Sequence, residues 1–484
     1  MRQEPGIPEK YKALSNLILQ VILVMAAYLR LSDLGRTSLW YDEAVSWQQS
    51  KGSFSELLAS VAADNYPPLH NAVLWLTMPL IGDGEIELRL PSALLGVLAV
   101  YLIYLAGSTL AGRPAGLLAA AMLAVSPFHI WYSTEARMYA LQAACGLAFL
   151  LSVQKVLARP SLAWLASLVL SGTLFLYSHY YALFGFAAVG GTCVVLAGID
   201  LAKGNRLTRS PAFTACAAMG TSTLAFLPWL AVLANRAKSV SDEGFWIAYP
   251  DAKFLENMAA SITGSLTLFW ILVALSVAAI AGTAIFSGPG SKSGPVSRRL
   301  ILVCLAYTVG PLLFGYLYSV LVQPILFDRY LIAAWPGLLL LAAVAAQRLL
   351  PALAPIALVA MSLYLTYPEL RFTLYEKMRP DWRSIVASYL DRRTGEDRLV
   401  LYKGFAAPVL KYYLRDPDAG NLAANPADLA RLAKSRRWLL LVHTDRDEMF
   451  EALKAFQVSE VNLVSRRFGW GASELSLFKR DSAN

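Results

Sequence analysis

Residues 13–29 read "ALSNLILQVILVMAAYL" and decide the fold class, because this long run is mostly apolar and carries no charged side chain. A helix needs about 17–25 mostly apolar residues to cross the hydrocarbon core of a bilayer. The preceding "MRQEPGIPEKYK" (1–12) is polar, and the apolar run is followed by no evident small-residue cleavage site. We therefore expect an uncleaved first transmembrane helix rather than a removed signal peptide.

The whole chain has the composition of a protein with many such helices. Of its 484 residues, 57% are hydrophobic and 15% are charged, and the mean hydropathy is +0.50. Soluble domains average about 25% charged residues. The predicted fold class is therefore a polytopic α-helical membrane protein. About eleven transmembrane helices are expected, near 14–31, 88–110, 114–132, 138–157, 161–178, 182–202, 211–233, 262–286, 300–320, 330–347 and 351–367.

The short loops between these runs predict the orientation. With the N-terminus in the cytoplasm, the basic residues of the short loops, such as Arg113, Arg159 and Lys203, fall on the cytoplasmic side. The net charge of +9 then reflects topology and not nucleic-acid binding. The run "PPLHNAVLWLTMPLIG" (67–82) is short, and we interpret it as a helix in the outer interface. We expect a multi-pass protein of the cytoplasmic (inner) membrane.

The composition changes after Pro368. Short segments typical of strands, "DRLVLY", "WLLLVHT", "EVNLV" and "ELSLFK", alternate there with amphipathic segments typical of helices. This alternation predicts a small α/β domain. We therefore predict a transmembrane module over 1–367, with a first external loop over 32–87 that bears interfacial helices. The predicted α/β domain covers 368–484 and lies outside the cytoplasm, in the periplasm or its equivalent.

Several separate segments bring charged, histidine and aromatic side chains to the predicted outer face. They are "YDEA" after the first span, "NYPPLH" in the same loop, "YSTEARMYAL" between the third and fourth spans, "YSHYYALF" between the fifth and sixth, and "LFDRYLIAAWP" at the tenth. The cytoplasmic loops contain nothing comparable. Because ionisable groups at membrane depth are costly and tend to mark function, the pattern predicts a functional site at the outer face.

Transfer of a sugar from a polyprenyl phosphate would use such a set of residues. The phosphate is already a good leaving group, so it needs positive charge and not a proton. One carboxylate can act as general base on the acceptor hydroxyl, and arginine offers bidentate hydrogen bonds to the phosphate. A divalent metal ion held by carboxylates is another way to offset the phosphate charge. A glycoside hydrolase would instead place a dedicated acid and a base on either side of the bond.

These segments resemble GT-C fold glycosyltransferases, specifically the bacterial relatives of protein O-mannosyltransferases and of the aminoarabinose transferase acting on lipid A. The likeness is carried, in this order, by "LWYDEA", "YPPLH", "RLPSALLGVLAVYLIY", "SPFHIWYSTEARMYAL" and "DRYLIAAWPGLLLL". The resemblance implies a polyprenyl-phosphate-linked sugar donor and inversion at the anomeric carbon. It also implies that the family's essential acid corresponds to Asp42, and its second acid, often aspartate, to Glu135. Metal dependence differs among relatives, so the resemblance leaves open a divalent ion held by Asp42 and Glu135.

The candidate residues follow from the motifs and the resemblance together. The candidate catalytic residues are Asp42, Glu43 and Glu135, and the candidate substrate-binding residues are His70, Arg137, Tyr139, His179, Tyr180, Asp328, Arg329 and Tyr330. Each has a structural alternative. Asp42 also fits a helix N-cap, and Glu43 fits a first-turn acid that the helix dipole favours. Arg137 and Arg329 each have a neighbouring acid that they could simply balance.

The predicted function is an inverting membrane glycosyltransferase of cell-envelope glycans. It would move a hexose or pentose from a polyprenyl-phosphate donor to a hydroxyl of a lipid, glycan or protein acceptor on the outer face. A ligase or polymerase that uses diphosphate-linked glycans would share such a site and is the alternative. A solute or lipid transporter is a weaker alternative, because transporters place polar residues at the bilayer midplane and often contain inverted repeats.

Overall fold

The computed structural model of the protein describes residues 9–243, 247–285, 295–349, 353–376, 379–394, 397–416, 421–468 and 474–480. The chain forms two compact units. The first, which we call the helical unit, comprises Met1–Asp33, Ser53–Thr77 and Arg89–Leu374. The second, which we call the α/β unit, comprises Leu34–Gly52, Met78–Leu88 and Tyr375–Asn484. The α/β unit thus combines the C-terminal region with two segments of the predicted first external loop.

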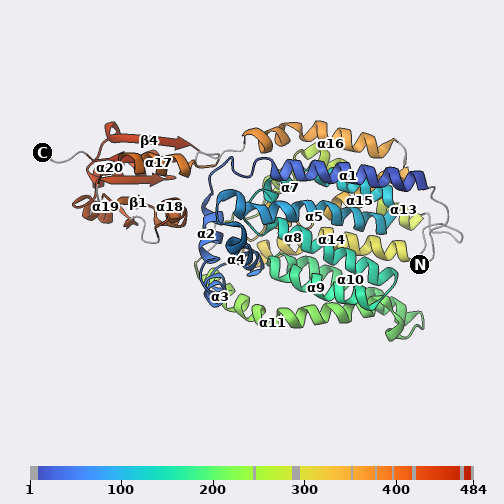
Figure 1. The fold of residues 1–484 in the computed structure, drawn as a ribbon. Helices are drawn as coiled ribbons and strands as arrows, with labels where there is room; N and C mark the ends of the chain where they lie inside the picture. The colour runs from blue at the N-terminus through green and yellow to red at the C-terminus, as the bar shows by residue number, and fades with distance from the viewer. Residues whose placement is uncertain are drawn as a thin grey trace. The chain divides into compact units, whose positions relative to one another are not determined.

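The helical unit is built mainly from apolar helices (Figure 1). Its elements are α1 (Glu9–Leu31), α3 (Phe54–Ala62), α4 (Leu69–Ile81), α5 (Glu85–Ala111), α6 (Arg113–Ala124), α7 (Pro127–Ser133), α8 (Tyr139–Ala158), α9 (Leu162–Ser178), α10 (Ala182–Ala202), η1 (Leu207–Arg209), α11 (Pro211–Glu243), α12 (Ala252–Thr263), α13 (Leu266–Ile285), α14 (Pro295–Leu321), η2 (Asp328–Leu331), α15 (Trp335–Leu349), α16 (Ala354–Arg371) and η3 (Phe372–Glu376). The ends of α4 and α5 that fall within 78–88 belong to the α/β unit, as do Tyr375 and Glu376 at the end of η3. Helices α8 and α9 pack together, as do α10 and α14, and their alanine, leucine and phenylalanine side chains form much of the core.

Six helices of the described residues are long and apolar enough to cross a membrane. The number rises to eight when two bent pairs, α6 with α7 and α12 with α13, each count as one span. Every expected span overlaps a helix, but the expected number of about eleven stays a prediction. The run at 67–82 contains the short apolar helix α4.

Two breaks in the predicted spans have a local cause and shape the site. The expected span over 114–132 bends by 65° between α6 and α7, where Pro127 follows Ser126 and cannot donate a backbone hydrogen bond. The expected span over 330–347 begins as a helix only at Trp335, with Pro336 in its first turn. Proline suits the first turn of a helix, because its missing N–H would have no helical partner there, and 328–331 form the separate 3₁₀ turn η2 before α15.

A buried arginine satisfies the backbone at the first of these breaks. Arg30, in the last turn of α1, is fully buried and donates to the carbonyls of Leu123 and Ala124 across 3.1 and 3.0 Å. These are the last residues of α6, whose carbonyls have no partner within their own helix. Arg30 Nη2 also lies 2.8 Å from Nδ1 of His129 on α7. These contacts stabilise the bend between α6 and α7, and the bend determines the position at which the 133–139 segment begins.

The α/β unit contains a mixed five-stranded sheet in the order β2-β1-β3-β5-β4. The strands are β1 (Leu399–Tyr402), β2 (Asn421–Ala423), β3 (Trp438–Val442), β4 (Leu463–Phe468) and β5 (Glu474–Lys479), and the remaining elements are α2 (Tyr41–Gln49), α17 (Trp382–Arg392), η4 (Gly404–Ala406), α18 (Ala407–Leu414), α19 (Pro426–Ala433), α20 (Arg446–Phe456) and η5 (Glu460–Asn462). Strands β2, β1 and β3 are parallel, and β5 runs antiparallel to both β3 and β4.

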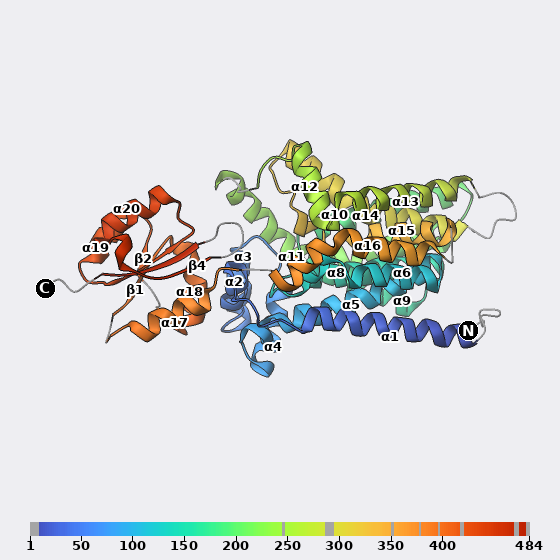
Figure 2. The same cartoon turned by 90° about the horizontal axis from the view of Figure 1, so that it is seen from above.

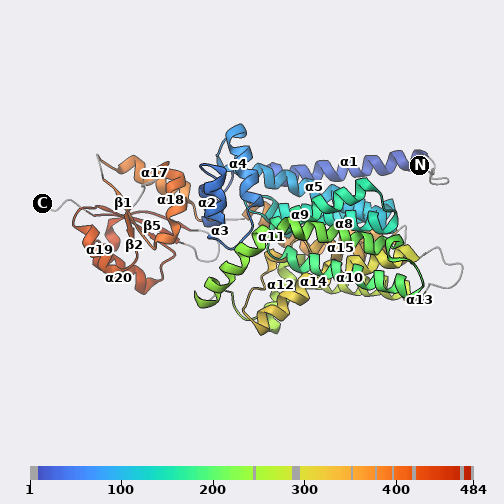
Figure 3. The ribbon, with the colours of Figure 1, turned by 90° about the horizontal axis from the view of Figure 1, so that it is seen from below.

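Helices cover both faces of this sheet. Figures 2 and 3 show α17 and α18 on one face and α19 and α20 on the other. The alternation along β1 explains the two layers, since Leu399 and Leu401 join the α17–α18 core whereas Val400 and Tyr402 join the α19–α20 core. The segment "EVNLV" differs from its predicted strand, because 460–462 form the turn η5 and β4 begins only at Leu463.

Candidate active site

Arg137 lies at the centre of a buried polar cluster in the helical unit. It sits in the turn between α7 and α8, and its residue is 5% exposed. Its Nη1 donates to the hydroxyl of Tyr66 across 3.1 Å, and its guanidinium carbon lies 4.5 Å from the centroid of the same ring. Burial raises the pKa of Tyr66, so the hydroxyl stays protonated and accepts the arginine hydrogen bond. Tyr66 thus holds Arg137, which the sequence predicts as a substrate-binding residue.

Arg329 enters the same region from a different part of the chain. It lies on η2, and its guanidinium carbon is 5.7 Å from the ring centroid of Tyr139, the first residue of α8. Its neighbour Asp328 accepts from the Arg329 backbone N–H and from Ser261 Oγ on α12, both across 2.6 Å. The contacts hold η2 against α12 and leave the arginine side chain among aromatic rings.

His179 connects the two arginines to a set of aromatic rings. It ends α9, and its ring centroid lies 4.8 Å from that of Tyr330 and 6.4 Å from that of Tyr139. Burial, followed by the positive charges of Arg137 and Arg329, lowers the pKa of His179 to about 3. The imidazole is therefore neutral at physiological pH, so beside the two arginines it can offer a hydrogen bond to an anion but adds no positive charge.

The remaining predicted residues of the helical unit are Glu135, His70 and Tyr180. Glu135 is 1% exposed, two residues before Arg137. His70 is 2% exposed in the first turn of α4. Tyr180 is partly buried and accepts a hydrogen bond from Trp229 Nε1 across 3.2 Å. The structure thus brings Arg137, Tyr139, His179, Arg329 and Tyr330 together through the contacts above. Glu135 and Tyr180 lie within two residues of Arg137 and His179 in the chain, and His70 comes from α4.

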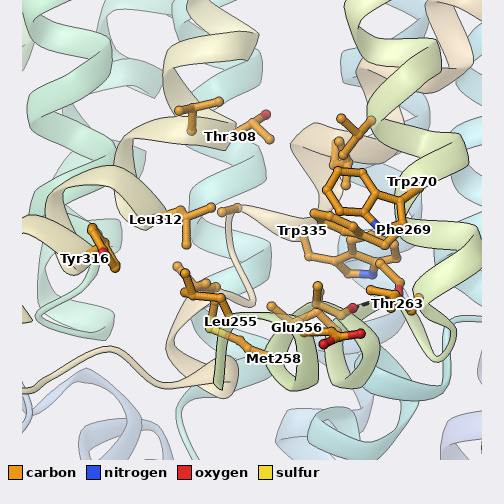
Figure 4. A pocket seen from close by; sticks show the side chains of 18 of the residues that line it. Leu255, Glu256, Met258, Thr263, Phe269, Trp270, Thr308, Leu312, Tyr316 and Trp335 are labelled. Carbon is orange, nitrogen blue, oxygen red and sulfur yellow. Dashed lines mark hydrogen bonds between the residues drawn. The ribbon is translucent and has the colours of Figure 1, made fainter. Parts of the chain in front are cut away.

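A large apolar cavity adjoins this cluster within the helical unit (Figure 4). Its volume is about 760 Å³, and its walls come from α12, α13, α14 and α15. Most of the side chains drawn in Figure 4, among them Met258, Trp270, Leu312 and Trp335, are apolar, and Glu256, Thr263, Thr308 and Tyr316 add polar atoms. Leu331, the last residue of η2, is also part of the wall. The cavity therefore reaches the turn that carries Arg329.

The cavity and the polar cluster share one group of packed side chains. Tyr181 and Leu331 are buried together with Met258, and Tyr330 and Tyr316 pack against them. Sequence reasoning missed the cavity, because its aliphatic lining looks the same as the lipid-facing surface of a transmembrane helix. It also missed the roles of Tyr66 and Ser261, although Tyr66 lies within the quoted motif "YPPLH".

The two remaining candidate acids belong to the α/β unit. Asp42 and Glu43 occupy the first turn of α2, whose N-cap is Trp40, so Asp42 is not the cap of this helix. The Asp42 side chain is half-buried, whereas Glu43 is fully buried and forms an ion pair of 2.6 Å with Arg379. Glu43 also accepts from the backbone N–H of Trp40 across 3.3 Å. The Glu43 carboxylate is thus engaged by a cation and by its own helix.

Within the described residues, no group of three or more histidine, cysteine, aspartate or glutamate side chains is placed to hold a metal ion. The expected ligands Asp42 and Glu135 belong to different units. A divalent ion held by these two acids stays a prediction, and none of the chemistry below depends on it.

Residues 65–231 match the family model of dolichyl-phosphate-mannose-protein mannosyltransferases. No curated protein matches the chain. Among solved structures, ArnT from Cupriavidus metallidurans in the apo state is similar with a TM-score of 0.65 and 15% identity, over 97% of this chain and 98% of that one. The same protein bound to undecaprenyl phosphate gives a TM-score of 0.61, also at 15% identity and over the same shares of both chains. The archaeal oligosaccharyltransferase AglB from Archaeoglobus fulgidus, in complex with an inhibitory peptide and a dolichol-phosphate, gives 0.53 at 11% identity, over 89% of this chain and 70% of that one.

Proposed function

We propose that this multi-pass membrane protein, which has the GT-C fold, is an inverting glycosyltransferase with a polyprenyl-phosphate-linked sugar as its donor. The acceptor is a hydroxyl of a lipid, glycan or protein at the outer face of the cytoplasmic membrane. The observation that carries the proposal is that an apolar cavity adjoins two arginines within one unit, the buried Arg137 and the partly buried Arg329. A lipid phosphate has the same division into an apolar tail and an anionic head.

The cavity suits a prenyl chain. Its volume of about 760 Å³ lies within the range of roughly 300–1,000 Å³ that is usual for small-molecule sites. Its walls offer aliphatic and aromatic side chains, which gain free energy from contact with hydrocarbon by close packing. Ser261 and Asp328 connect one wall, α12, to the turn η2. With its prenyl chain in the cavity, the donor would have its phosphate close to η2 and to Arg329.

The polar cluster suits the phosphate. Arg137 and Arg329 can each offer two parallel N–H groups to phosphate oxygens. Arg137 is buried and Arg329 is partly buried, and shielding from bulk water strengthens the interaction of a cation with an anion. A neutral His179 can add one N–H donor, although it contributes no charge. These residues stabilise the charge that grows on the phosphate as the bond to the sugar breaks.

Asp42 is our candidate for the general base, on the basis of the motif "LWYDEA". Its carboxylate would accept the proton of the acceptor hydroxyl while the acceptor oxygen forms a bond to the anomeric carbon. The bond from that carbon to the phosphate oxygen breaks, and the electron pair leaves with the polyprenyl phosphate. Attack from the face opposite the leaving group inverts the anomeric configuration. Glu135 is the candidate for a second acid in the site.

The test is transfer of a radiolabelled sugar in membranes supplied with polyprenyl-phosphate sugars. A general base contributes about 10²–10⁴-fold to the rate, so Asp42→Asn should lower the initial rate by at least about 100-fold. The matched control Asp391→Asn changes an exposed aspartate of α17 and should leave the rate unchanged. Normal transfer by a folded Asp42→Asn protein would overturn the assignment of the base. Transfer only from diphosphate-linked donors would instead favour the ligase or polymerase alternative.

A further inference from the structure

Helix α2, which carries Asp42, packs into the hydrophobic core formed by the C-terminal part of the α/β unit. Ala44 is fully buried in the cluster that contains Trp382 of α17, Leu410 of α18 and Trp438 of β3. The ring of Tyr41 lies 5.9 Å from that of Phe405, which belongs to the turn before α18. A short helix of nine residues is marginal by itself in water, so most of its stability comes from such packing.

A buried ion pair fixes the first turn of α2 to the same domain. Glu43 and Arg379 are 2.6 Å apart, and their side chains are 0% and 6% exposed. The guanidinium carbon of Arg379 also lies 5.2 Å from the ring centroid of Trp40, the N-cap of α2. A buried ion pair tolerates little displacement, because a charge that loses its partner away from water is strongly unfavourable.

The rest of the segment around α2 is held in the same way. Nε1 of Trp47, in the last turn, donates to Asp83 Oδ2 across 2.8 Å, and Arg415 Nη1 donates to the same oxygen across 2.7 Å. The rings of Trp47 and Tyr412 meet edge to face with centroids 5.0 Å apart. Before the helix, the backbone N–H of Leu39 donates to the hydroxyl of Tyr413 on α18 across 2.7 Å. The helix is thus held at both ends.

We propose that the C-terminal α/β domain positions the general base, and that Arg379 is the positioning residue that acts on Asp42 through Glu43. The inference rests on the proposed function of Asp42. Successive residues of a helix point about 100° apart. When Arg379 holds the Glu43 side chain inward, the neighbouring Asp42 side chain takes a fixed direction at the half-buried edge of the helix.

The main test compares Arg379→Gln with Arg431→Gln in the full-length protein. Arg431 forms an ion pair with Asp428 within α19, on the other face of the sheet and away from α2, so it is a matched control. Misplacement of a catalytic group by about 1 Å costs about 100-fold in rate. We expect Arg379→Gln to lower kcat by roughly that factor with little change in the donor KM, and Arg379→Lys to restore part of the loss. Unchanged kcat in Arg379→Gln would overturn the inference.

Two further measurements separate positioning from loss of folding. In a background of Asp42→Asn, Arg379→Gln should lower kcat no further, because the group that it positions is already absent. An additional loss of similar size there would show a general effect and overturn the inference. Should Arg379→Gln fail to fold, Arg379→Lys tests the role of Arg379, and Tyr413→Phe tests positioning by the domain. Tyr413→Phe removes a hydroxyl that accepts from Leu39 and donates to Glu85, and it should lower kcat only where Asp42 is present.

Hydrogen exchange gives a readout that does not depend on activity. Backbone amides of 41–49 should exchange faster in Arg379→Gln than in Arg431→Gln, while the strands β1 and β3 stay protected in both variants. Unchanged exchange in 41–49, or faster exchange throughout the sheet, would overturn the proposed positioning role. If Asp42→Asn itself transfers sugar normally, the proposed base fails, and the exchange result still decides whether Arg379 holds α2.

Discussion

The backbone N–H of Tyr181 donates a hydrogen bond to Nδ1 of His179 across 3.1 Å, and this contact determines which ring nitrogen carries the proton. A nitrogen that accepts a hydrogen bond cannot be protonated, so the neutral ring carries its proton on Nε2. Burial, followed by the charges of Arg137 and Arg329, lowers the pKa of His179 to about 3. The ring therefore offers one N–H donor beside two arginines over the whole physiological range.

The first prediction concerns the dependence of stability on pH. The ordinary histidine pKa is about 6.5, so between that value and about 3 the unfolded chain binds a proton that the folded protein does not. Stability from the neutral ring is thus present above pH 6.5 and is lost as the pH falls. The melting temperature of the detergent-solubilised protein should fall less between pH 7 and 5 in His179→Asn than in the wild type. An identical slope in both proteins would contradict a neutral, buried His179.

The second prediction concerns the contact between Arg137 and Tyr66. Tyr66→Phe keeps the ring under the guanidinium but removes the hydroxyl that accepts its hydrogen bond. A hydrogen bond to a charged group contributes about 1.5–3 kcal/mol, so we expect the donor kcat/KM to fall by roughly 10- to 100-fold. Arg137→Lys should cost at least as much, because lysine cannot form bidentate bonds to a phosphate.

Tyr28→Phe is the matched control for the hydroxyl, since Tyr28 lies exposed on α1. Steady-state kinetics with a polyprenyl-phosphate sugar would measure all three variants. Equal kinetics in Tyr66→Phe and Tyr28→Phe would remove Tyr66 from the site.

The third prediction places the prenyl chain in the cavity of Figure 4. Leu312→Trp replaces a leucine of the wall with a larger side chain that would fill part of the cavity, so it should raise the KM for long-chain donors. Donors with one or two prenyl units need less of the cavity and should be affected less. Leu317→Trp makes the same substitution at an exposed position of the same helix, outside the cavity wall, and should leave both KM values unchanged. A KM increase that does not depend on chain length would argue against this placement.

Features that depend on residues close in the chain could be predicted from the sequence, whereas contacts between distant residues could not. Periodicity and the prolines locate the helices, since each depends on residues close in the chain. Arg137 and Arg329 were found because the motifs around them resemble a family. Their partners were not found, since Tyr66 lies 71 residues from Arg137, and Arg379 lies 336 residues from Glu43. No local pattern encodes such pairs, and an apolar cavity wall has the same composition as a lipid-facing helix.

The last prediction concerns the break between α6 and α7, which sets the position of the Arg137 segment. A Cβ atom added at Gly96 on α5 would collide with Ser133 Oγ, would lie 2.7 Å from Ser133 Cβ and would lie 3.1 Å from Cδ of Arg30. Overpacking of this kind costs about 1–3 kcal/mol, so Gly96→Ala should lower the melting temperature. Ser133 ends α7, so the same clash should also move the segment toward Arg137 and lower sugar transfer.

Gly191→Ala on α10 is the matched control, because an added Cβ there has no neighbouring heavy atom within 4 Å among the described residues. Alanine is favoured over glycine within a helix by up to about 1 kcal/mol, so this variant should melt at the same temperature as the wild type or slightly above it. Thermal unfolding in detergent and transfer activity would be measured for both variants. If Gly96→Ala behaved like Gly191→Ala in both assays, the tight contact between α5, Ser133 and Arg30 would have no part in holding the site.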